Sequence, residues 1–141
     1  MESTKFIFSA HEQETMRNLS VAALVLFGSR AQGAANGMSD YDIGVIVAGR
    51  SHLYDAQKRK EIYDALYDIL SRHIRKLVDV DIVFLETAPS ELQAHVMKHG
   101  KVIFESEKAA FARFKECVMT QYADFAPLRE IFHRGILERI R

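Results

Sequence analysis

The strongest constraint on the fold is an unbroken apolar run from Val21 to Phe27 that ends at Gly28. A short continuous apolar run closed by glycine is typical of a buried β-strand that stops at a turn. A second strand is expected at Tyr41–Val47, where Tyr41, Ile43 and Val45 share one face and Asp42 and Gly44 share the other. The chain must therefore build a sheet and cover it with other elements.

Helical patterns surround these two strands. Ser9 and Glu12 have the spacing of a capping box, so a helix is expected over 10–19. Thr87 is expected to cap a helix over 88–99 that Gly100 closes. The remaining expected elements are a helix at 56–75, strands at 78–85 and 101–105, and a helix over 106–141 interrupted near Pro127. The helix at 56–75 is expected to bury one apolar stripe, made of Ile62, Leu66, Ile69 and Leu70.

This order of elements predicts an α/β (α+β) fold with a small mixed sheet and helices packed mainly on one face. The length of 141 residues fits one domain. We expect that domain to occupy residues 1–105. Residues 106–141 then form a C-terminal helical extension, packed on the same domain or on a partner.

Composition excludes several classes of function. Nineteen basic residues balance nineteen acidic ones, so no large cationic surface for nucleic acid or a membrane is expected. The single cysteine, Cys117, cannot form an internal disulfide or a paired-cysteine zinc site. No apolar run approaches the ~20 residues of a membrane span, and the short apolar patch at Phe6–Phe8 is too weak to predict a secretory signal. We therefore expect a soluble cytoplasmic protein.

The junction after the first strand carries candidate binding groups. Gly28 allows a ligand to approach the main chain closely, and backbone N–H groups at a strand-to-helix junction favour phosphate. The Ser29 hydroxyl adds a donor, and Arg30 either reaches a triphosphate or lies on the surface. A P-loop is disfavoured because no Gly-Lys-Ser/Thr follows Gly28.

Carboxylates at two strands carry the candidate chemistry. Asp40 and Asp42 are expected on one face, and Gly44 next to them leaves room for a ligand. Adjacent carboxylates repel, and Mg²⁺ shared with nucleotide phosphates relieves that repulsion. A third carboxylate, from Asp79 or Asp81, would complete a two-metal site with ions ~3.5–4 Å apart.

Two segments resemble a known family. The segment "LFGSRAQGAANGMSDYDIGVIV" resembles the signature of the minimal nucleotidyltransferases of the DNA polymerase β superfamily. The segment "VDIVFLETAPSELQAHVMKHGKVIFE" is similar to a later part of that family, and the match favours Asp81 over Asp79. The resemblance implies a nucleotidyltransferase domain in residues 1–105 and a polymerase-β-like fold. It also implies two Mg²⁺ ions, with Mn²⁺ as an alternative, on Asp40, Asp42 and Asp81, and ATP bound by Gly28, Ser29 and Arg30.

The whole chain is similar to a narrower family, the nucleotidyltransferase antitoxins paired with HEPN-domain ribonuclease toxins. Its length and its tail "YADFAPLREIFHRGILERI" carry that similarity. The family implies transfer of AMP from ATP to a tyrosine of the toxin, with release of pyrophosphate. The tail repeats apolar residues every four positions, which favours contact with the toxin or with a second copy; these residues are Leu128, Phe132, Ile136 and Ile140.

Two other functions stay open at this point. The chain could neutralise a toxin by binding alone, without transferring a nucleotide. It could also modify a small molecule such as an aminoglycoside, although no second substrate-binding domain is evident.

Overall fold

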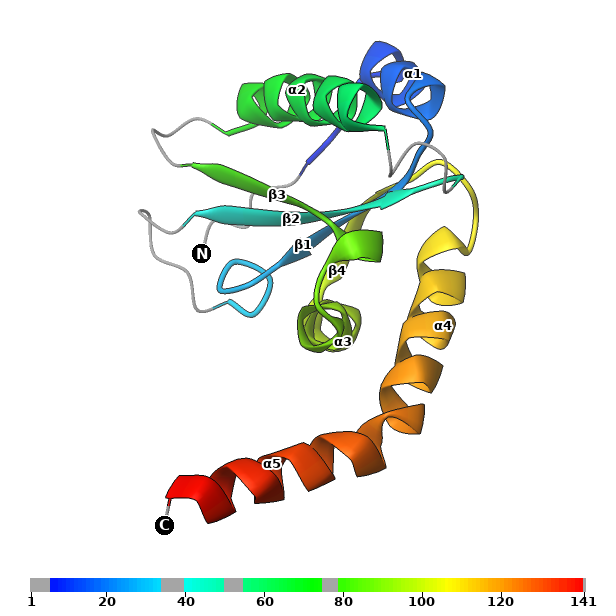
Figure 1. Ribbon diagram of the computed structural model, residues 1–141. Helices are drawn as coiled ribbons and strands as arrows, with labels where there is room; N and C mark the ends of the chain where they lie inside the picture. Colours follow the sequence, from blue (N-terminus) through cyan, green and yellow to red (C-terminus); the bar gives the residue numbers. More distant parts are fainter. Residues whose placement is uncertain (1–5, 34–39, 50–54, 75–78, 141) are drawn as a thin grey trace.

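A mixed four-stranded sheet forms the centre of the molecule (Figure 1). The computed structural model describes residues 6–33, 40–49, 55–74 and 79–140. The strands are β1 (Val21–Phe27), β2 (Tyr41–Val47), β3 (Val80–Phe84) and β4 (Lys101–Glu105), in the order β3-β2-β1-β4. Strand β1 is antiparallel to β2 and β4, and β2 is parallel to β3. The four predicted strands are confirmed, although β3 is shorter than expected and Val78 lies outside the described residues.

Helices α1 (Ala10–Asn18) and α2 (Ala56–Arg72) cover one face of the sheet. Figure 1 shows both above the strands. The buried stripe of α2 is the one that the sequence predicts, namely Ile62, Leu66, Ile69 and Leu70. It packs with Met16 of α1 against Ile43 and Val45 of β2.

The opposite face is covered by α3 (Ser90–His99) and α4 (Ala110–Asp124). Val96, Met97 and Val118 pack there against Val25 and Ile46. The expectation of helices mainly on one face is therefore wrong. Every residue of β1 is buried, and a strand that is apolar on both sides requires cover on both sides.

The helix ends show which capping predictions hold. The Ser9 hydroxyl accepts the Glu12 N–H and the Glu12 side chain accepts the Ser9 N–H, as the capping box predicts. The predicted Thr87 cap is wrong, because its hydroxyl donates to the Phe84 carbonyl and α3 begins only at Ser90. Pro89 disfavours helical backbone at the residue before it, and Ala88 is extended. A short 3-10 helix, η2 (Leu85–Thr87), occupies the junction instead.

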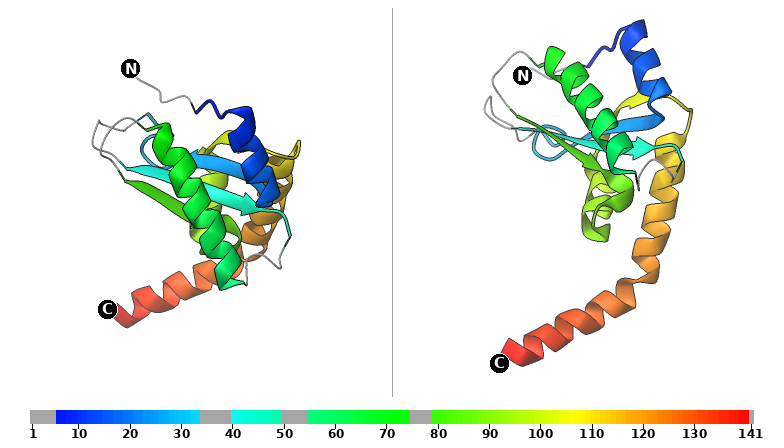
Figure 2. Two further views of the ribbon diagram at one scale, coloured as in Figure 1. Left: turned by 90° about the horizontal axis from the view of Figure 1, so that it is seen from above. Right: turned by 45° about the horizontal axis from the view of Figure 1, so that its top comes forward.

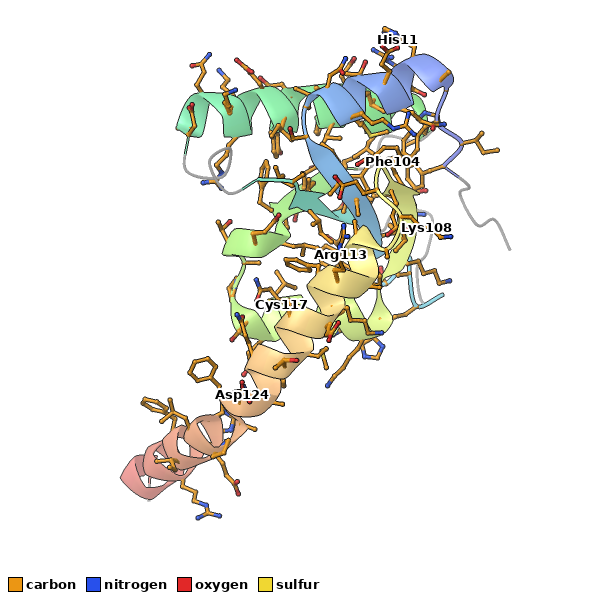
Figure 3. All side chains as sticks on the ribbon, turned by 90° about the vertical axis from the view of Figure 1, so that its right-hand side faces the viewer. His11, Phe104, Lys108, Arg113, Cys117 and Asp124 are labelled. Atoms are coloured by element: carbon orange, nitrogen blue, oxygen red, sulfur yellow. The ribbon has the colours of Figure 1, made fainter. Side chains whose placement is uncertain are left out.

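Helix α5 (Ala126–Ile140) follows α4 after a break at Phe125, close to the predicted interruption at Pro127. Figure 2 shows α5 leading away from the sheet and its covering helices. Cys117 lies exposed on α4 (Figure 3). No helix in the described part of the chain combines the length and apolar character needed to cross a membrane.

Candidate active site

The register of β2 and β3 brings two acidic residues together. These strands run parallel, and Asp42 is the direct partner of Asp81. Neighbours in adjacent strands project to the same face, which is the face of Ile46 and of helix α3. Asp40 immediately precedes β2 and is exposed, two residues from Asp42. The structure therefore gathers Asp40, Asp42 and Asp81 at one end of the sheet.

These carboxylates act on each other electrostatically. Burial raises the pKa of Asp42, and the negative charges of Asp81 and Asp40 raise it further. Asp42 is half-buried, whereas the other two side chains are exposed. Negative charges that disfavour each other in this way form a site where a cation is stabilised.

Asp79, the other candidate for the third carboxylate, does not pair with Asp42 as Asp81 does. It precedes β3 and its carbonyl accepts the Tyr41 N–H at 3.0 Å. Its side chain is exposed, and it precedes by two residues the position that pairs with Asp42. The register thus places Asp81, rather than Asp79, directly beside Asp42.

Gly28 brings the main chain against Asp42. Its φ of +76° is a conformation that glycine adopts without strain. A Cβ at this position would overlap Oδ2 of Asp42, so only glycine lets the turn and the carboxylate approach. The Gly28 carbonyl accepts N–H groups of Ala31 at 3.1 Å and Gln32 at 3.3 Å.

This turn is shorter than the sequence predicts. Turns follow Gly28 as far as Gly33, whose φ is +73°, and no helix is formed there. A helix dipole therefore adds little to anion binding at this junction, where the free backbone N–H groups of the turn remain. Residues 34–39, whose small and polar side chains indicate a loop, lie outside the described residues.

The prediction that Gly44 leaves room for a ligand is wrong. A Cβ at Gly44 would lie 2.8–2.9 Å from three carbon atoms of the Leu85 side chain. Leu85 is fully buried, and its side chain fills the space over Gly44. The absence of a side chain at Gly44 therefore accommodates η2, because the chain returns over this face directly after β3.

Arg30 contacts an aromatic ring that sequence reasoning did not connect with it. Its guanidinium carbon lies 3.8 Å from the centroid of the Tyr41 ring. That ring belongs to the core cluster on the α1 and α2 side, opposite Asp42. Tyr41 and Leu85 are thus two residues bordering the site that were missed. The only sequence signals were the position of Tyr41 between two aspartates and the apolar character of Leu85.

The side chains at this end of the sheet fit a hard divalent cation. Carboxylate oxygens are the ligands that Mg²⁺ and Mn²⁺ accept. Burial, and then the charges of Asp81 and Asp40, raise the pKa of Asp42, so a nearby cation would favour its ionised form. Asp42 and Asp81 are the residues placed to hold such an ion, with Asp40 beside them. Within the described residues, no group of three or more Asp, Glu, His or Cys side chains is arranged so that it could hold a metal ion.

The comparisons with known proteins define the class of the chain. Residues 11–109 match the family described as Polymerase beta, Nucleotidyltransferase. That match covers more than half of the sequence and includes Gly28, Ser29, Asp40, Asp42 and Asp81. The chain therefore belongs to the polymerase β nucleotidyltransferase family, as its motifs predict.

One curated protein is similar to this chain in sequence. The chain is 35% identical over 98 residues to the protein adenylyltransferase MntA of Aphanizomenon flos-aquae (strain 2012/KM1/D3). This match covers 68% of the chain and 65% of that relative, slightly under two thirds of its length.

Solved structures share the fold at lower identity. A toxin–antitoxin crystal structure with AMP-PNP aligns with a TM-score of 0.66 and 23% identity, over 92% of this chain and 99% of that one. A complex of a tri-AMPylated Shewanella oneidensis HEPN toxin with an MNT antitoxin aligns with a TM-score of 0.59 and 21% identity. That alignment covers 90% of this chain and 97% of the other.

Proposed function

We propose that this protein is an antitoxin that transfers AMP from ATP to a tyrosine of a cognate HEPN-domain ribonuclease toxin and so neutralises it. The observation that carries the proposal is the pairing of Asp42 with Asp81 across β2 and β3, beside the Gly28 turn. The MntA relative named as a protein adenylyltransferase supports the activity. The shared fold with a structure that holds AMP-PNP supports ATP as the donor.

The chain's own residues account for the proposed transfer. The triphosphate lies on the Gly28–Ser29 turn, where the glycine main chain permits close approach. The tyrosine oxygen of the acceptor attacks the α-phosphorus, and the bond from that phosphorus to the β-phosphate oxygen breaks. Pyrophosphate leaves, and Asp81 accepts the tyrosine proton. Most of the rate enhancement comes from alignment of the two reactants.

We propose Asp40, Asp42 and Asp81 as the residues that hold Mg²⁺, with Mn²⁺ as an alternative. When bound, two such ions supply positive charge that offsets the carboxylates and the charge developing on the phosphate oxygens. Cytoplasmic action belongs to the same proposal, because ATP and the RNA that the toxin cleaves are found there.

The C-terminal helices provide the proposed contact with the toxin. A groove of about 350 Å³ lies between α3, α4 and α5, and its lining includes Val118, Tyr122, Phe125, Leu128 and Phe132. Phe125 and Phe132 are more than half exposed. Helices α3 and α4 cover the sheet face on which Asp42 and Asp81 lie, so a protein bound in the groove is on the side of the carboxylates. Under this proposal, residues 1–105 carry out the AMP transfer and residues 106–141 bind the toxin.

A direct test incubates the purified chain with the HEPN protein, ATP and Mg²⁺, and measures the intact mass of the HEPN protein. We expect the mass to rise by one or more AMP groups and pyrophosphate to be released, with the modified tyrosine located by peptide sequencing. An Asp42→Asn variant is the control and should leave the mass unchanged.

The other outcomes separate the remaining functions. An unmodified but inhibited ribonuclease would identify an antitoxin that acts by binding alone. An unmodified and active ribonuclease, together with pyrophosphate release in the presence of an aminoglycoside, would identify a small-molecule nucleotidyltransferase. Either result would overturn the proposal.

A further inference from the structure

Arg30 and Tyr41 connect the two chain segments of the site. Arg30 is two residues beyond Gly28, and its guanidinium carbon lies 3.8 Å from the centroid of the Tyr41 ring. Tyr41 lies between Asp40 and Asp42 at the start of β2. A cation over an aromatic face at this distance is an attractive contact, and it is stronger where water is excluded. The ring is 4% exposed, so the contact is largely desolvated on the tyrosine side.

The Tyr41 ring is itself held from other directions. Phe6 packs edge-on against it, with ring centroids 5.9 Å apart and an interplanar angle of 90°. The backbone N–H of Tyr41 donates to the Asp79 carbonyl at 3.0 Å, which ties this residue to the chain entering β3. The ring is therefore a fixed platform rather than a mobile side chain.

The position of the Gly28 turn is sensitive to small shifts. Gly28 lies so close to Asp42 that a single added carbon would overlap the carboxylate. Ala31, which follows Arg30, is buried in the core cluster that also contains Tyr41. Movement of this turn therefore changes the space available to the Asp42 carboxylate and to any phosphate beside it.

We infer that Arg30 is a positioning residue, which fixes the Gly28–Ser29 turn against the strand carrying Asp40 and Asp42 by stacking on Tyr41 behind the sheet. The guanidinium acts through the ring and the turn, on the face opposite the carboxylates, rather than as a ligand of the triphosphate. The inference rests on the proposed function, because it assigns a role within AMP transfer.

The two roles predict different kinetics. A phosphate ligand contributes to nucleotide binding whether or not the ring beneath it is present. A positioning residue loses its effect once the ring is removed, because the two side chains act as one unit. Displacing reacting groups by about 1 Å lowers turnover by about 100-fold, while a nucleotide can still bind.

The test uses the full chain with its HEPN protein and measures kcat and KM for ATP. Binding of α,β-methylene-ATP, which cannot lose pyrophosphate, is measured separately. The variants are Arg30→Met, Tyr41→Leu and their combination, with Tyr41→Phe and Arg30→Lys as conservative replacements. Arg59→Met is a matched control, because Arg59 stacks on Phe84 at 5.2 Å and joins α2 to β3 away from the carboxylates.

We expect Tyr41→Leu and Arg30→Met each to lower kcat by about 10- to 100-fold with a smaller change in nucleotide affinity. The double variant should be no slower than the slower single variant, and Tyr41→Phe and Arg30→Lys should retain most activity. Arg59→Met should leave kcat unchanged. Additive losses, or weaker α,β-methylene-ATP binding on Arg30→Met in both Tyr41 backgrounds, would overturn the inference. Lack of AMP transfer by the wild-type chain would instead count against the proposed function.

Discussion

The ionised carboxylate of Asp42 destabilises the folded chain. Its pKa is raised by burial and by the charges of Asp81 and Asp40, so the folded chain binds a proton there more readily than the unfolded chain does. Its ionised form therefore lowers the free energy of unfolding above the folded pKa. This penalty is relieved as the pH falls through that pKa.

The Asp42→Asn variant should accordingly be more stable than the wild type in EDTA at pH 7. We expect a higher Tm by thermal unfolding, and we expect the difference to shrink as the pH approaches 4. Added Mg²⁺ should raise the Tm of the wild type more than that of the variant. The exposed Asp64 of α2 supplies the control variant, Asp64→Asn. A lower Tm for Asp42→Asn in EDTA would contradict this account of the carboxylate cluster.

Alanine substitutions at Gly28 and Gly33 distinguish the effect of backbone strain from the effect of crowding against Asp42. Both have positive φ, +76° and +73°, so alanine at either position costs about 1–2 kcal/mol of stability. A Cβ at Gly33 meets nothing within 4 Å among the described residues, whereas one at Gly28 meets Asp42. Gly28→Ala should abolish AMP transfer and Gly33→Ala should retain most of it, as measured by initial rates at saturating ATP. Equal losses in both variants would show that strain alone explains the effect.

The kind of site was predictable from the residue types and their spacing, but the contacts between residues far apart in the sequence were not. The spacing of Gly28, Asp40 and Asp42 indicates the kind of site, since each residue type has a local physical reason. The contact of Leu85 with Gly44 depends on how the chain turns after β3, which no local pattern encodes. The stacking of Arg30 on Tyr41 likewise depends on how the folded chain brings the end of β1 next to the start of β2.

At the scale of elements, a hydrogen-bonded contact between Glu12 and His73 joins α1 to the end of α2. Glu12 is buried, and its carboxylate oxygens lie 3.0 and 3.2 Å from Nε2 of His73. Burial alone raises the pKa of Glu12, but hydrogen bonds from Ser9 and His73, together with the charge of His73, outweigh it. The pKa of Glu12 is therefore lower than in the unfolded chain. The resulting stability is present above the unfolded pKa of about 4.3 and is lost as the pH falls through the folded value.

Removing this carboxylate should flatten the acid limb of the stability profile. We expect the free energy of unfolding of the wild type, measured by urea titration, to decrease as the pH falls below about 4.3. Glu12→Gln should be less stable at pH 7 and show a smaller decrease on acidification. Glu14→Gln on the exposed side of the same helix should follow the wild type. A parallel decrease for Glu12→Gln and the wild type would assign the acid sensitivity to other groups.

Element types and positions follow closely from the sequence. The capping box at Ser9 and the stripe of α2 are determined by local hydrogen bonding and periodicity, so they were predictable. The start of α3 differs from the prediction, because Pro89 keeps Ala88 extended and this outweighs the capping preference of Thr87. The sequence of β1 does indicate that helices cover both faces of the sheet, since all of its residues are apolar.

At the scale of the whole molecule, α5 exposes apolar side chains that the rest of the chain leaves partly uncovered. Leu128, Ile131 and Phe132 are 48%, 64% and 62% exposed. The predicted stripe also includes Ile136 and Ile140, whose side chains lie outside the described part. Buried aromatic anchors dominate the energetics of most interfaces, so Phe132 is the residue to change.

Phe132→Asp should weaken binding of the HEPN protein by about 30-fold or more, measured by calorimetry. Ile7 is a matched control because it is 76% exposed but lies before α1, so Ile7→Asp should bind normally. Unchanged affinity of a folded Phe132→Asp variant would show that the groove and α5 are not the docking surface.

The central claim is that the carboxylates paired across β2 and β3 carry out the transfer. The most direct measurement compares AMP transfer to the HEPN protein by Asp81→Asn and Asp79→Asn, each verified as folded by circular dichroism. Asp81 is the partner of Asp42, whereas Asp79 precedes it by two residues, so Asp81→Asn should lose nearly all activity and Asp79→Asn should retain most of it. Full activity of Asp81→Asn, or a greater loss in Asp79→Asn, would contradict the account.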